Sequence, residues 1–243
     1  MTRVENTPGN EVQPVTDASW DAWIKAYRPN ENSTNTTISY YSKGAMVALI
    51  LDLIIIQETQ AEKNLDDVMR YLYKEYYQKQ QRGFTEDEIK HAIEKVAGKD
   101  LSTFFEKHIY GTQTLPYEKH LASVGLKLNT ETENKVYLGI STTRVAKKLK
   151  INRIKKDSPA YKSGLNVNDE IVKINDQKVK DLTKFMESKE VGDQIKVEIC
   201  RDGNVKKFLV TLEKNPHITY KLTPQKNKTE KQKKAYKKWL RKI

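Results

Sequence analysis

The sequence predicts a multidomain α and β protein, with an N-terminal all-α bundle, then a small β-barrel domain, then a basic C-terminal helix. Residues 45–56 hold eleven apolar residues in twelve, interrupted only by Asp52, which indicates a buried helix at the centre of the first part. From about Leu121 the hydrophobic period changes from helical to alternating, which indicates strands. Residues 221–243 hold nine lysines, one arginine and one glutamate, so the last segment is strongly basic.

The apolar run at residues 45–56 is too continuous for a half-exposed helix and too long for an ordinary strand. A membrane-spanning helix is the alternative, but such a helix needs about 20 apolar residues. This run lies between Lys43 and the polar residues 57–60. We therefore expect a core helix that is covered by protein, and no membrane span.

Start and stop signals divide the rest of the first part into helices. Asp17 or Ser19 can begin a short helix that ends before Pro29. Three further helices follow the central one, and their candidate N-caps are Asn64, Thr85 (in a capping box with Glu88) and Asp100.

Five short segments of the second part alternate apolar and polar residues and are separated by turn residues. They are residues 136–140, 149–154, 170–174, 194–199 and 207–212. The single cysteine, Cys200, directly follows the fourth segment. An internal disulfide framework is therefore excluded, and we expect Cys200 to be structural.

The formal net charge of +12 suggests nucleic-acid binding until the charge is located. Residues 221–243 carry +9 of it, so the preceding 220 residues are nearly neutral. In this tail Tyr236, Trp239, Leu240 and Ile243 recur at the spacing of one helix face. A basic amphipathic helix can bind a membrane surface or nucleic acid, but it can also dock its aromatic side on the chain's own body. We favour docking and do not expect nucleic-acid binding.

The central helix begins with Ser-Tyr-Tyr-Ser-Lys-Gly at residues 39–44. Together with Ser-Trp-Asp-Ala-Trp at 19–23 and Tyr-Arg-Pro-Asn-Glu-Asn at 27–32, it resembles the gluzincin aminopeptidases, and among them the glycyl aminopeptidase-type zinc metallopeptidases that carry a PDZ domain. The resemblance implies that Tyr41 hydrogen-bonds the tetrahedral intermediate of peptide hydrolysis. From the residues alone, a tyrosine packed against a core with its hydroxyl in water is the commoner case.

Residues 101–117 resemble the end of the catalytic domain in the same family, with Leu-x-x-Phe-Phe followed by Gly-Thr-x-x-Leu-Pro-Tyr. We therefore expect residues 1–117 to form the helical C-terminal part of a metallopeptidase catalytic domain. The resemblance implies a PDZ domain at residues 118–214 and leaves a basic tail with an amphipathic helix at residues 215–243.

The PDZ resemblance rests on Asp-Ser-Pro-Ala-Tyr-Lys-Ser-Gly-Leu at residues 157–165, followed by Val-Asn-Asp at 167–169 and Ile-Asn-Asp-Gln at 174–177. This order closely resembles the pattern of bacterial PDZ domains. Asn168 and Asp176 stand where the pattern has glycine. Because asparagine and aspartate tolerate a left-handed backbone nearly as well, the PDZ fold is still expected.

The PDZ resemblance implies a peptide-binding groove. In such domains the amides of an x-Φ-Gly-Φ loop hold a peptide carboxylate, and the next strand accepts the peptide as an added strand. Tyr137-Leu138-Gly139-Ile140 matches that loop, although the same residues could form an ordinary core strand. We expect the side-chain pocket to be lined by the loop and by the helix at 181–188, through Leu138, Ile140, Leu182, Phe185 and Met186.

A zinc aminopeptidase of this class needs His-Glu-x-x-His on one helix and a distant third ligand. The histidines are His91, His108, His120 and His217, and no two have that spacing, so we expect no metal site and no cofactor in this chain. The resemblance places zinc and the rest of the catalytic domain, as a partner, upstream of Met1 in a longer protein. The polar N-terminus has no signal-peptide pattern. We expect a soluble chain of undetermined compartment, and periplasmic or secreted locations stay open for the longer protein.

These observations predict the C-terminal fragment of a zinc-dependent aminopeptidase-like metallopeptidase. It would supply Tyr41 and a PDZ module that binds peptides or protein C-termini, and it would be inactive as a peptidase by itself. One alternative is a non-catalytic PDZ adaptor. Another is a nucleic-acid binder that acts through the basic tail, which would show steeply salt-dependent DNA binding.

Overall fold

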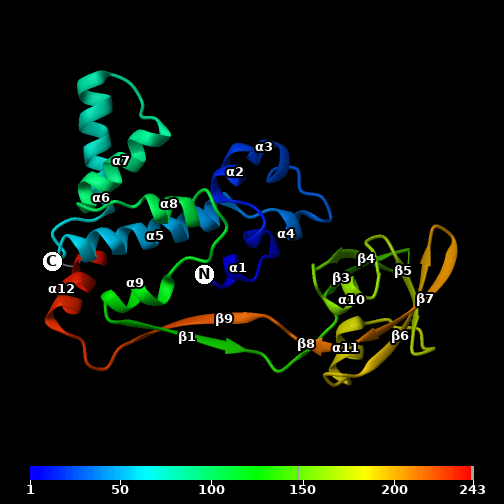
Figure 1. Ribbon diagram of the computed structural model, residues 1–243. Coiled ribbons are helices and arrows are strands. Elements are labelled where there is room, and N and C mark those ends of the chain that lie inside the picture. Colours follow the sequence, from blue (N-terminus) through cyan, green and yellow to red (C-terminus); the bar gives the residue numbers. More distant parts are fainter. Residues whose placement is uncertain (147, 242–243) are drawn as a thin grey trace.

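The structure of the protein is a computed structural model that describes residues 1–146 and 148–241. It consists of a helical part, a β-sheet domain and a two-stranded ribbon that connects them (Figure 1). The predicted order of helical part, β domain and C-terminal helix is confirmed. The helical part contains α1 (Thr2–Glu5), the 3-10 helix η1 (Pro8–Glu11), α2 (Val15–Trp20), α3 (Ala22–Lys25), α4 (Ser33–Thr36), α5 (Tyr40–Glu58), α6 (Leu65–Leu72), the π-helix η2 (Tyr73–Gln78), α7 (Glu86–Ala97), α8 (Ser102–His108) and α9 (Tyr117–Ser123).

Helix α5 is the predicted core helix. It begins at Tyr40 because the Ser39 side chain caps it, accepting a hydrogen bond from the Ser42 amide at 3.3 Å. Most of its apolar residues are buried in a hydrophobic core to which residues of α6 to α9 also contribute. By length and composition the stretch Ser33–Glu58 would suffice to cross a membrane. Within this stretch the residues from Ile50 to Ile56 are buried against protein, as expected of a core helix.

The predicted caps of α6 and α7 are confirmed, and with η2 the two helices form a hairpin that projects from the body (Figure 1). The Asn64 side chain accepts a hydrogen bond from the first turn of α6, and the Asp67 carboxylate accepts one from the Asn64 amide at 2.9 Å. Thr85 and Glu88 form the predicted capping box. Helix α7 ends at Gly98, whose φ of 66° is left-handed and therefore suits glycine.

Strand β1 (Leu126–Thr132) pairs antiparallel with β9 (Ile218–Pro224) in a ribbon that was not expected from the sequence. Residues of α9 and β1 also contribute to the helical core, through Leu121 and Leu126 among others. The helical core therefore extends beyond the predicted boundary at residue 117. Segment 218–224, predicted as tail, is a strand because it pairs with β1. This pairing was not predicted because the two strands lie far apart along the chain and no local sequence pattern reveals it.

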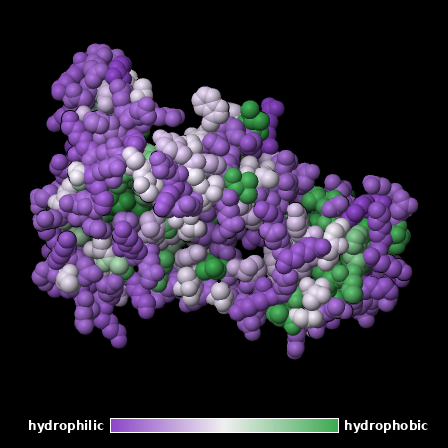
Figure 2. All heavy atoms as spheres, viewed as in Figure 1, coloured by the Kyte–Doolittle hydropathy of each residue, from purple (hydrophilic) through white to green (hydrophobic). Residues whose placement is uncertain are grey.

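The β domain contains an antiparallel sheet of five strands in the order β3-β4-β5-β6-β7, and a separate pair of β2 with β8. The predicted β-barrel is not closed, because within residues 1–146 and 148–241 strand β3 pairs only with β4 and β7 only with β6. Hydrophobic groups reach the surface over this domain, whereas the α6–α7 hairpin is mostly polar (Figure 2). The elements are β2 (Val136–Tyr137), β3 (Ile140–Val145), β4 (Lys148–Ile154), α10 (Pro159–Lys162), β5 (Glu170–Ile174), α11 (Leu182–Glu187), β6 (Gln194–Arg201), β7 (Asn204–Thr211) and β8 (Glu213–Lys214).

The basic helix α12 (Glu230–Trp239) docks on the chain's own body, as predicted. Ala235 is buried in the helical core, and Tyr236 and Trp239 pack against that core from the same face. Ile243, the fourth apolar residue of the predicted face, lies outside the described residues.

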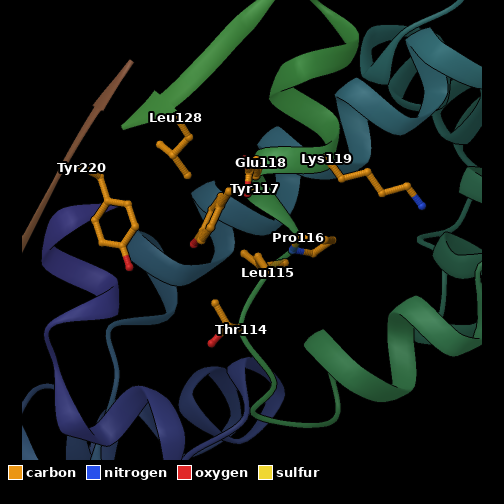
Figure 3. A pocket seen from close by; sticks show the side chains of 8 residues that line it. All are labelled: Thr114, Leu115, Pro116, Tyr117, Glu118, Lys119, Leu128 and Tyr220. Carbon is orange, nitrogen blue, oxygen red and sulfur yellow. The ribbon is translucent and has the colours of Figure 1, made fainter. Parts of the chain in front are cut away.

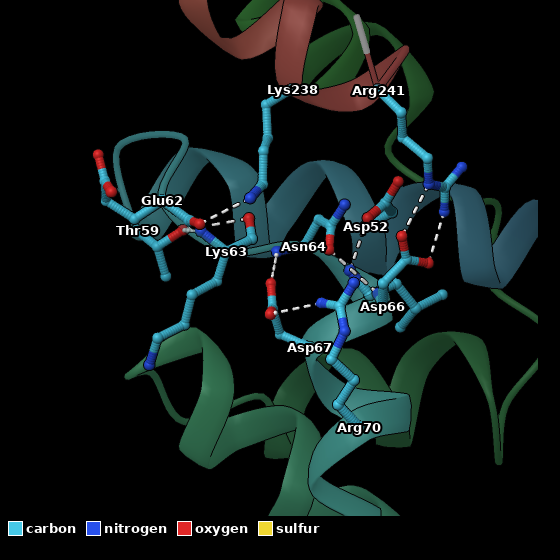
Figure 4. A network of polar contacts seen from close by, with 11 residues as sticks. Asp52, Thr59, Glu62, Lys63, Asn64, Asp66, Asp67, Arg70, Lys238 and Arg241 are labelled. Carbon is cyan, nitrogen blue, oxygen red and sulfur yellow. Dashed lines mark hydrogen bonds and ion pairs between the residues drawn. The ribbon is translucent and has the colours of Figure 1, made fainter. Parts of the chain in front are cut away.

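Polar contacts surround the docked end of α12 (Figure 4). The Arg241 guanidinium donates to both carboxylate oxygens of Asp66, at 2.6 and 2.7 Å. The Lys238 ammonium donates to the main-chain carbonyl of Glu62 at 2.7 Å. Exposed ion pairs contribute about 0–1 kcal/mol each, so the apolar face of α12 supplies most of the docking free energy.

Candidate functional sites

Tyr41 lies in the first turn of α5, and its side chain is 67% exposed. Its ring lies 4.1 Å from that of Tyr40 between centroids, and its hydroxyl oxygen lies 3.1 Å from that of Tyr27. Tyr41 is therefore not packed into the core, and a substrate could reach its hydroxyl. Its catalytic role stays a prediction.

An exposed aromatic surface adjoins Tyr41. Trp20, Trp23 and Ile24 of α2 and α3 are 89%, 79% and 74% exposed. The Trp23 ring lies 5.0 Å from the Tyr27 ring between centroids. Contiguous exposed apolar side chains commonly mark a binding surface. The sequence places these residues on a short helix, but their exposure follows from the tertiary structure alone.

Lys43 of the same motif has a different environment from Tyr41. Its side chain is only 2% exposed, and its ammonium donates to the Asn10 carbonyl at 3.3 Å. Burial lowers the pKa of Lys43, and the nearby Glu5 carboxylate opposes that shift. Lys43 thus links the start of α5 to η1 through a hydrogen bond, and its buried ammonium is not available to a substrate.

The described residues form no cluster that fits a catalytic zinc. In the described ranges, no three or more His, Cys, Asp or Glu side chains come together in a group that could hold a metal ion. His108 and His120 are both buried, and the His108 ring nitrogen Nδ1 lies 3.0 Å from the Gln113 carbonyl oxygen.

The predicted peptide loop is held in a left-handed turn at Gly139, whose φ is 83°. A Cβ atom at this position would lie 2.1 Å from the Ser158 Cβ, so only glycine fits. The carbonyls of Leu138 and Gly139 accept hydrogen bonds from the amides of Ala160 and Lys155, at 3.0 and 2.9 Å. Within the described part of the chain the amides of Leu138 and Gly139 themselves have no acceptor.

Strand β3 follows this loop at the edge of the sheet. It pairs with β4 from Ile140, opposite Ile154, to Val145, opposite Lys148. No other strand in the described ranges pairs with its second edge. An exposed edge of this kind can accept a further extended strand.

A cavity of about 540 Å³ lies at the loop. All the predicted pocket residues line it except Phe185, which packs against the core of the β domain instead. Leu138 lines the cavity but is only 4% exposed, because its side chain belongs mainly to that core. The lining residues are Asn134, Lys135, Val136, Tyr137, Leu138, Gly139, Ile140, Leu182, Thr183, Met186, Glu187 and Lys189.

Several of these lining residues are not among those expected from the sequence. Thr183 and Glu187 lie four positions apart on α11, as do Leu182 and Met186. Helical periodicity could therefore have identified Thr183 and Glu187 as lining residues. Tyr137 lines the cavity with a hydroxyl that is buried and finds no hydrogen-bond partner among the described residues. Burial, with the nearby Glu213, raises the pKa of Tyr137 to about 12.

A second cavity, of about 550 Å³, lies where the ribbon meets the helical part (Figure 3). Leu128 and Tyr220 of the ribbon line it, opposite the segment from Thr114 to Lys119. The Tyr117 hydroxyl donates to the Glu5 carboxylate at 2.7 Å, and burial together with this bond raises the pKa of Tyr117. None of the predicted site residues lines this cavity.

Two family models match the chain. Residues 1–47 match the M61 glycyl aminopeptidase family, and residues 136–212 match the PDZ domain. A search of curated proteins finds no match.

Among solved structures, an aminopeptidase N family protein from Idiomarina loihiensis superimposes with a TM-score of 0.82 at 25% sequence identity. The match covers 98% of this chain and 42% of that protein, so this chain spans less than half of its length. A serine endoprotease from Yersinia pestis superimposes with a TM-score of 0.30 at 23% identity, over 33% of this chain and 29% of its own. The family matches and the whole-chain superposition agree: the chain contains an M61 glycyl aminopeptidase region followed by a PDZ domain.

Proposed function

We propose that this chain binds the C-terminal ends of peptides or proteins in the cavity between the 136–140 loop and α11. The main support comes from the main-chain amides of Leu138 and Gly139. They lie at the cavity and have no acceptor among the described residues. Neighbouring main-chain amides on a turn of this kind form a binding site for an anion.

The same geometry indicates how the rest of the peptide would lie. With its carboxylate on the two amides, an extended peptide can add to the free edge of β3 through main-chain hydrogen bonds. Its last side chain would contact Ile140, Leu182 and Met186, which are partly buried apolar residues at the cavity. An apolar last residue is therefore favoured.

A titration of the ¹⁵N-labelled chain followed by NMR tests this proposal. The probes are peptides that end in Val, Leu or Phe, each prepared as the free acid and as the amide. We expect shifts at residues 138–145 and 182–187, a Kd on the order of micromolar, and binding at least about tenfold weaker for the amides. Equal binding of acid and amide, or shifts confined to other residues, would contradict it.

We also propose that Tyr41 serves a peptidase site in a longer protein whose zinc-binding residues lie outside this chain. The match of residues 1–47 to the M61 family and the exposure of the Tyr41 hydroxyl support this second function. A phenol at this position can donate a hydrogen bond to the oxygen that gains charge as a peptide carbonyl is attacked. One such donor typically changes kcat by about 10²–10³-fold.

The test is Tyr41→Phe in the longer protein. We expect kcat to fall about 10²-fold or more, with KM, zinc content and thermal stability little changed. Tyr110→Phe, at an exposed tyrosine just after α8, is the control. An unchanged kcat for Tyr41→Phe would remove this function and leave peptide binding by the PDZ domain in place.

A further inference from the structure

Three tyrosine hydroxyls come together at the N-terminal end of α5. The Tyr27 hydroxyl oxygen lies 3.0 Å from that of Tyr40 and 3.1 Å from that of Tyr41. Tyr40 and Tyr41 begin α5, whereas Tyr27 comes from the segment that follows α3. The loop between these two segments therefore brings Tyr27 back onto the start of the helix.

Tyr40 and Tyr27 have contacts beyond the triad that support them. Tyr40 is partly buried and packs against the small core formed by Val4, Ala18 and Ile38. Tyr27 is 51% exposed, but its ring makes a tilted contact with that of Trp23, and its amide donates to the Ala22 carbonyl at 3.0 Å.

Tyr41 has less support than its two neighbours. Its side chain is 67% exposed, and its described contacts in the triad are the tilted stack on Tyr40 and the bond to the Tyr27 hydroxyl. A side chain this exposed samples several rotamers unless a specific contact selects one. The Tyr27 hydroxyl supplies such a contact.

The distances allow either oxygen of each pair to donate, and the pKa directions favour one arrangement. The neighbouring hydroxyls of Tyr27 and then Tyr40 lower the pKa of Tyr41, whereas those of Tyr27 and then Tyr41 raise the pKa of Tyr40. A hydroxyl that accepts a hydrogen bond loses its proton more readily, and one that donates loses it less readily. Both directions agree with one chain, in which Tyr40 donates to Tyr27 and Tyr27 donates to Tyr41.

We propose that Tyr27 is the positioning residue of Tyr41: its hydroxyl donates to the Tyr41 oxygen, fixes the exposed ring, and leaves the Tyr41 proton to be donated outward to a substrate. The positioning contact exists in this chain itself, whereas its use in catalysis rests on the proposed function of Tyr41. In such a chain each donor polarises the next, so the terminal hydroxyl becomes a stronger donor.

The first test uses this chain alone. Tyrosines labelled with ¹³C at Cζ are titrated by NMR, and Tyr41→Phe identifies the Tyr41 signal. Tyr27→Phe keeps the ring on Trp23 but removes the hydroxyl, so we expect the Tyr41 titration to move upward by about one pH unit. Tyr110→Phe should leave it in place. An unmoved Tyr41 titration in Tyr27→Phe would overturn the proposal.

The second test uses the longer protein and separates the two claims. If both hold, Tyr27→Phe lowers kcat about threefold to tenfold with KM unchanged, a smaller loss than for Tyr41→Phe. If Tyr41→Phe keeps full activity, the catalytic role of Tyr41 fails, and the NMR titration still decides the positioning contact. If Tyr41→Phe loses activity while Tyr27→Phe keeps all of it, Tyr27 is not the positioning residue.

Discussion

The side-chain amide of Asn35 donates a hydrogen bond of 2.7 Å to the main-chain carbonyl of Ile154, and its oxygen accepts one of 2.9 Å from the Lys156 amide. Asn35 lies in α4 and is only 7% exposed. Between these two partners, the Lys155 amide donates to the Gly139 carbonyl. The turn at residues 154–156 therefore contacts the helical part through Asn35 and the peptide loop through Gly139.

We expect Asn35→Ala to loosen the β domain from the helical part. The substitution leaves the buried Ile154 carbonyl without its partner, which costs about 1–3 kcal/mol, and also removes the acceptor of the Lys156 amide. Urea unfolding should show this loss, and amide hydrogen exchange at Lys156 should accelerate. Asn227→Ala, in an exposed turn, is the control. Unchanged exchange at Lys156 would mean that Asn35 does not join the two parts.

Gly139→Ala tests the peptide loop against a matched glycine. Gly203 has almost the same φ, 79° against 83°, but a Cβ atom there would meet no atom within 4 Å, whereas at Gly139 it would clash with Ser158. Gly203→Ala should therefore cost only the left-handed backbone strain, about 1–2 kcal/mol. Gly139→Ala should cost more and abolish peptide binding in the NMR titration. If both variants lose equal stability and both bind peptide, the loop adapts to the side chain and does not need glycine.

A buried ion pair supports the β domain. Asp169 is 0% exposed, and the Arg201 guanidinium donates to its two oxygens at 2.7 and 2.8 Å. Arg201→Leu leaves a buried carboxylate without its charged partner, so we expect a loss of about 3–5 kcal/mol in urea unfolding. The double variant Asp169→Asn with Arg201→Leu should recover part of the loss, since no charge is then buried. No recovery would show that packing by Arg201, including its 5.4 Å contact with the Phe208 ring, dominates.

The sequence predicts some helix starts and misses others. Helix α2 begins at Val15, before the expected caps Asp17 and Ser19, and the N-cap of α8 is Leu101, not Asp100. The caps at Asn64 and Thr85 are confirmed, since a cap depends on residues three positions apart. Asn168 and Asp176, which replace glycines of the PDZ pattern, take the left-handed conformation with φ of 74° and 63°. The conformational preference of asparagine and aspartate is thus enough to predict these two turns from the sequence.

The missed features depend on contacts between distant residues. The ribbon of β1 and β9 joins two polar, alternating segments. Neither segment has a sequence feature that indicates which strand it pairs with. Phe185 and Met186 are adjacent on α11, but only Met186 lines the cavity, because the orientation of the helix is set by tertiary packing. The meeting of Tyr27 with Tyr41 likewise depends on the path of the loop between them.

We expect His120 to make the helical part sensitive to acid. It is 7% exposed, and its Nδ1 has no hydrogen-bond partner among the residues described. Burial first, and then the nearby Lys119 and Lys99, lower the pKa of His120 to about 4. The unfolded chain titrates near the ordinary value of about 6.5. Between these values only the unfolded state binds the proton, so the stabilising contribution of neutral His120 is complete above about pH 6.5 and is lost as the pH falls to about 4.

We therefore expect the free energy of unfolding to fall by about 2 kcal/mol between pH 7 and pH 5 through His120 alone, because each pKa unit corresponds to about 1.4 kcal/mol. Urea unfolding at both pH values measures it. His120→Gln has no proton to gain, so this part of the pH dependence should vanish, whereas His91→Gln, at an exposed position, should keep it. If His120→Gln loses as much stability on acidification as the parent chain, the buried imidazole is protonated in the folded state and the acid sensitivity comes from other groups.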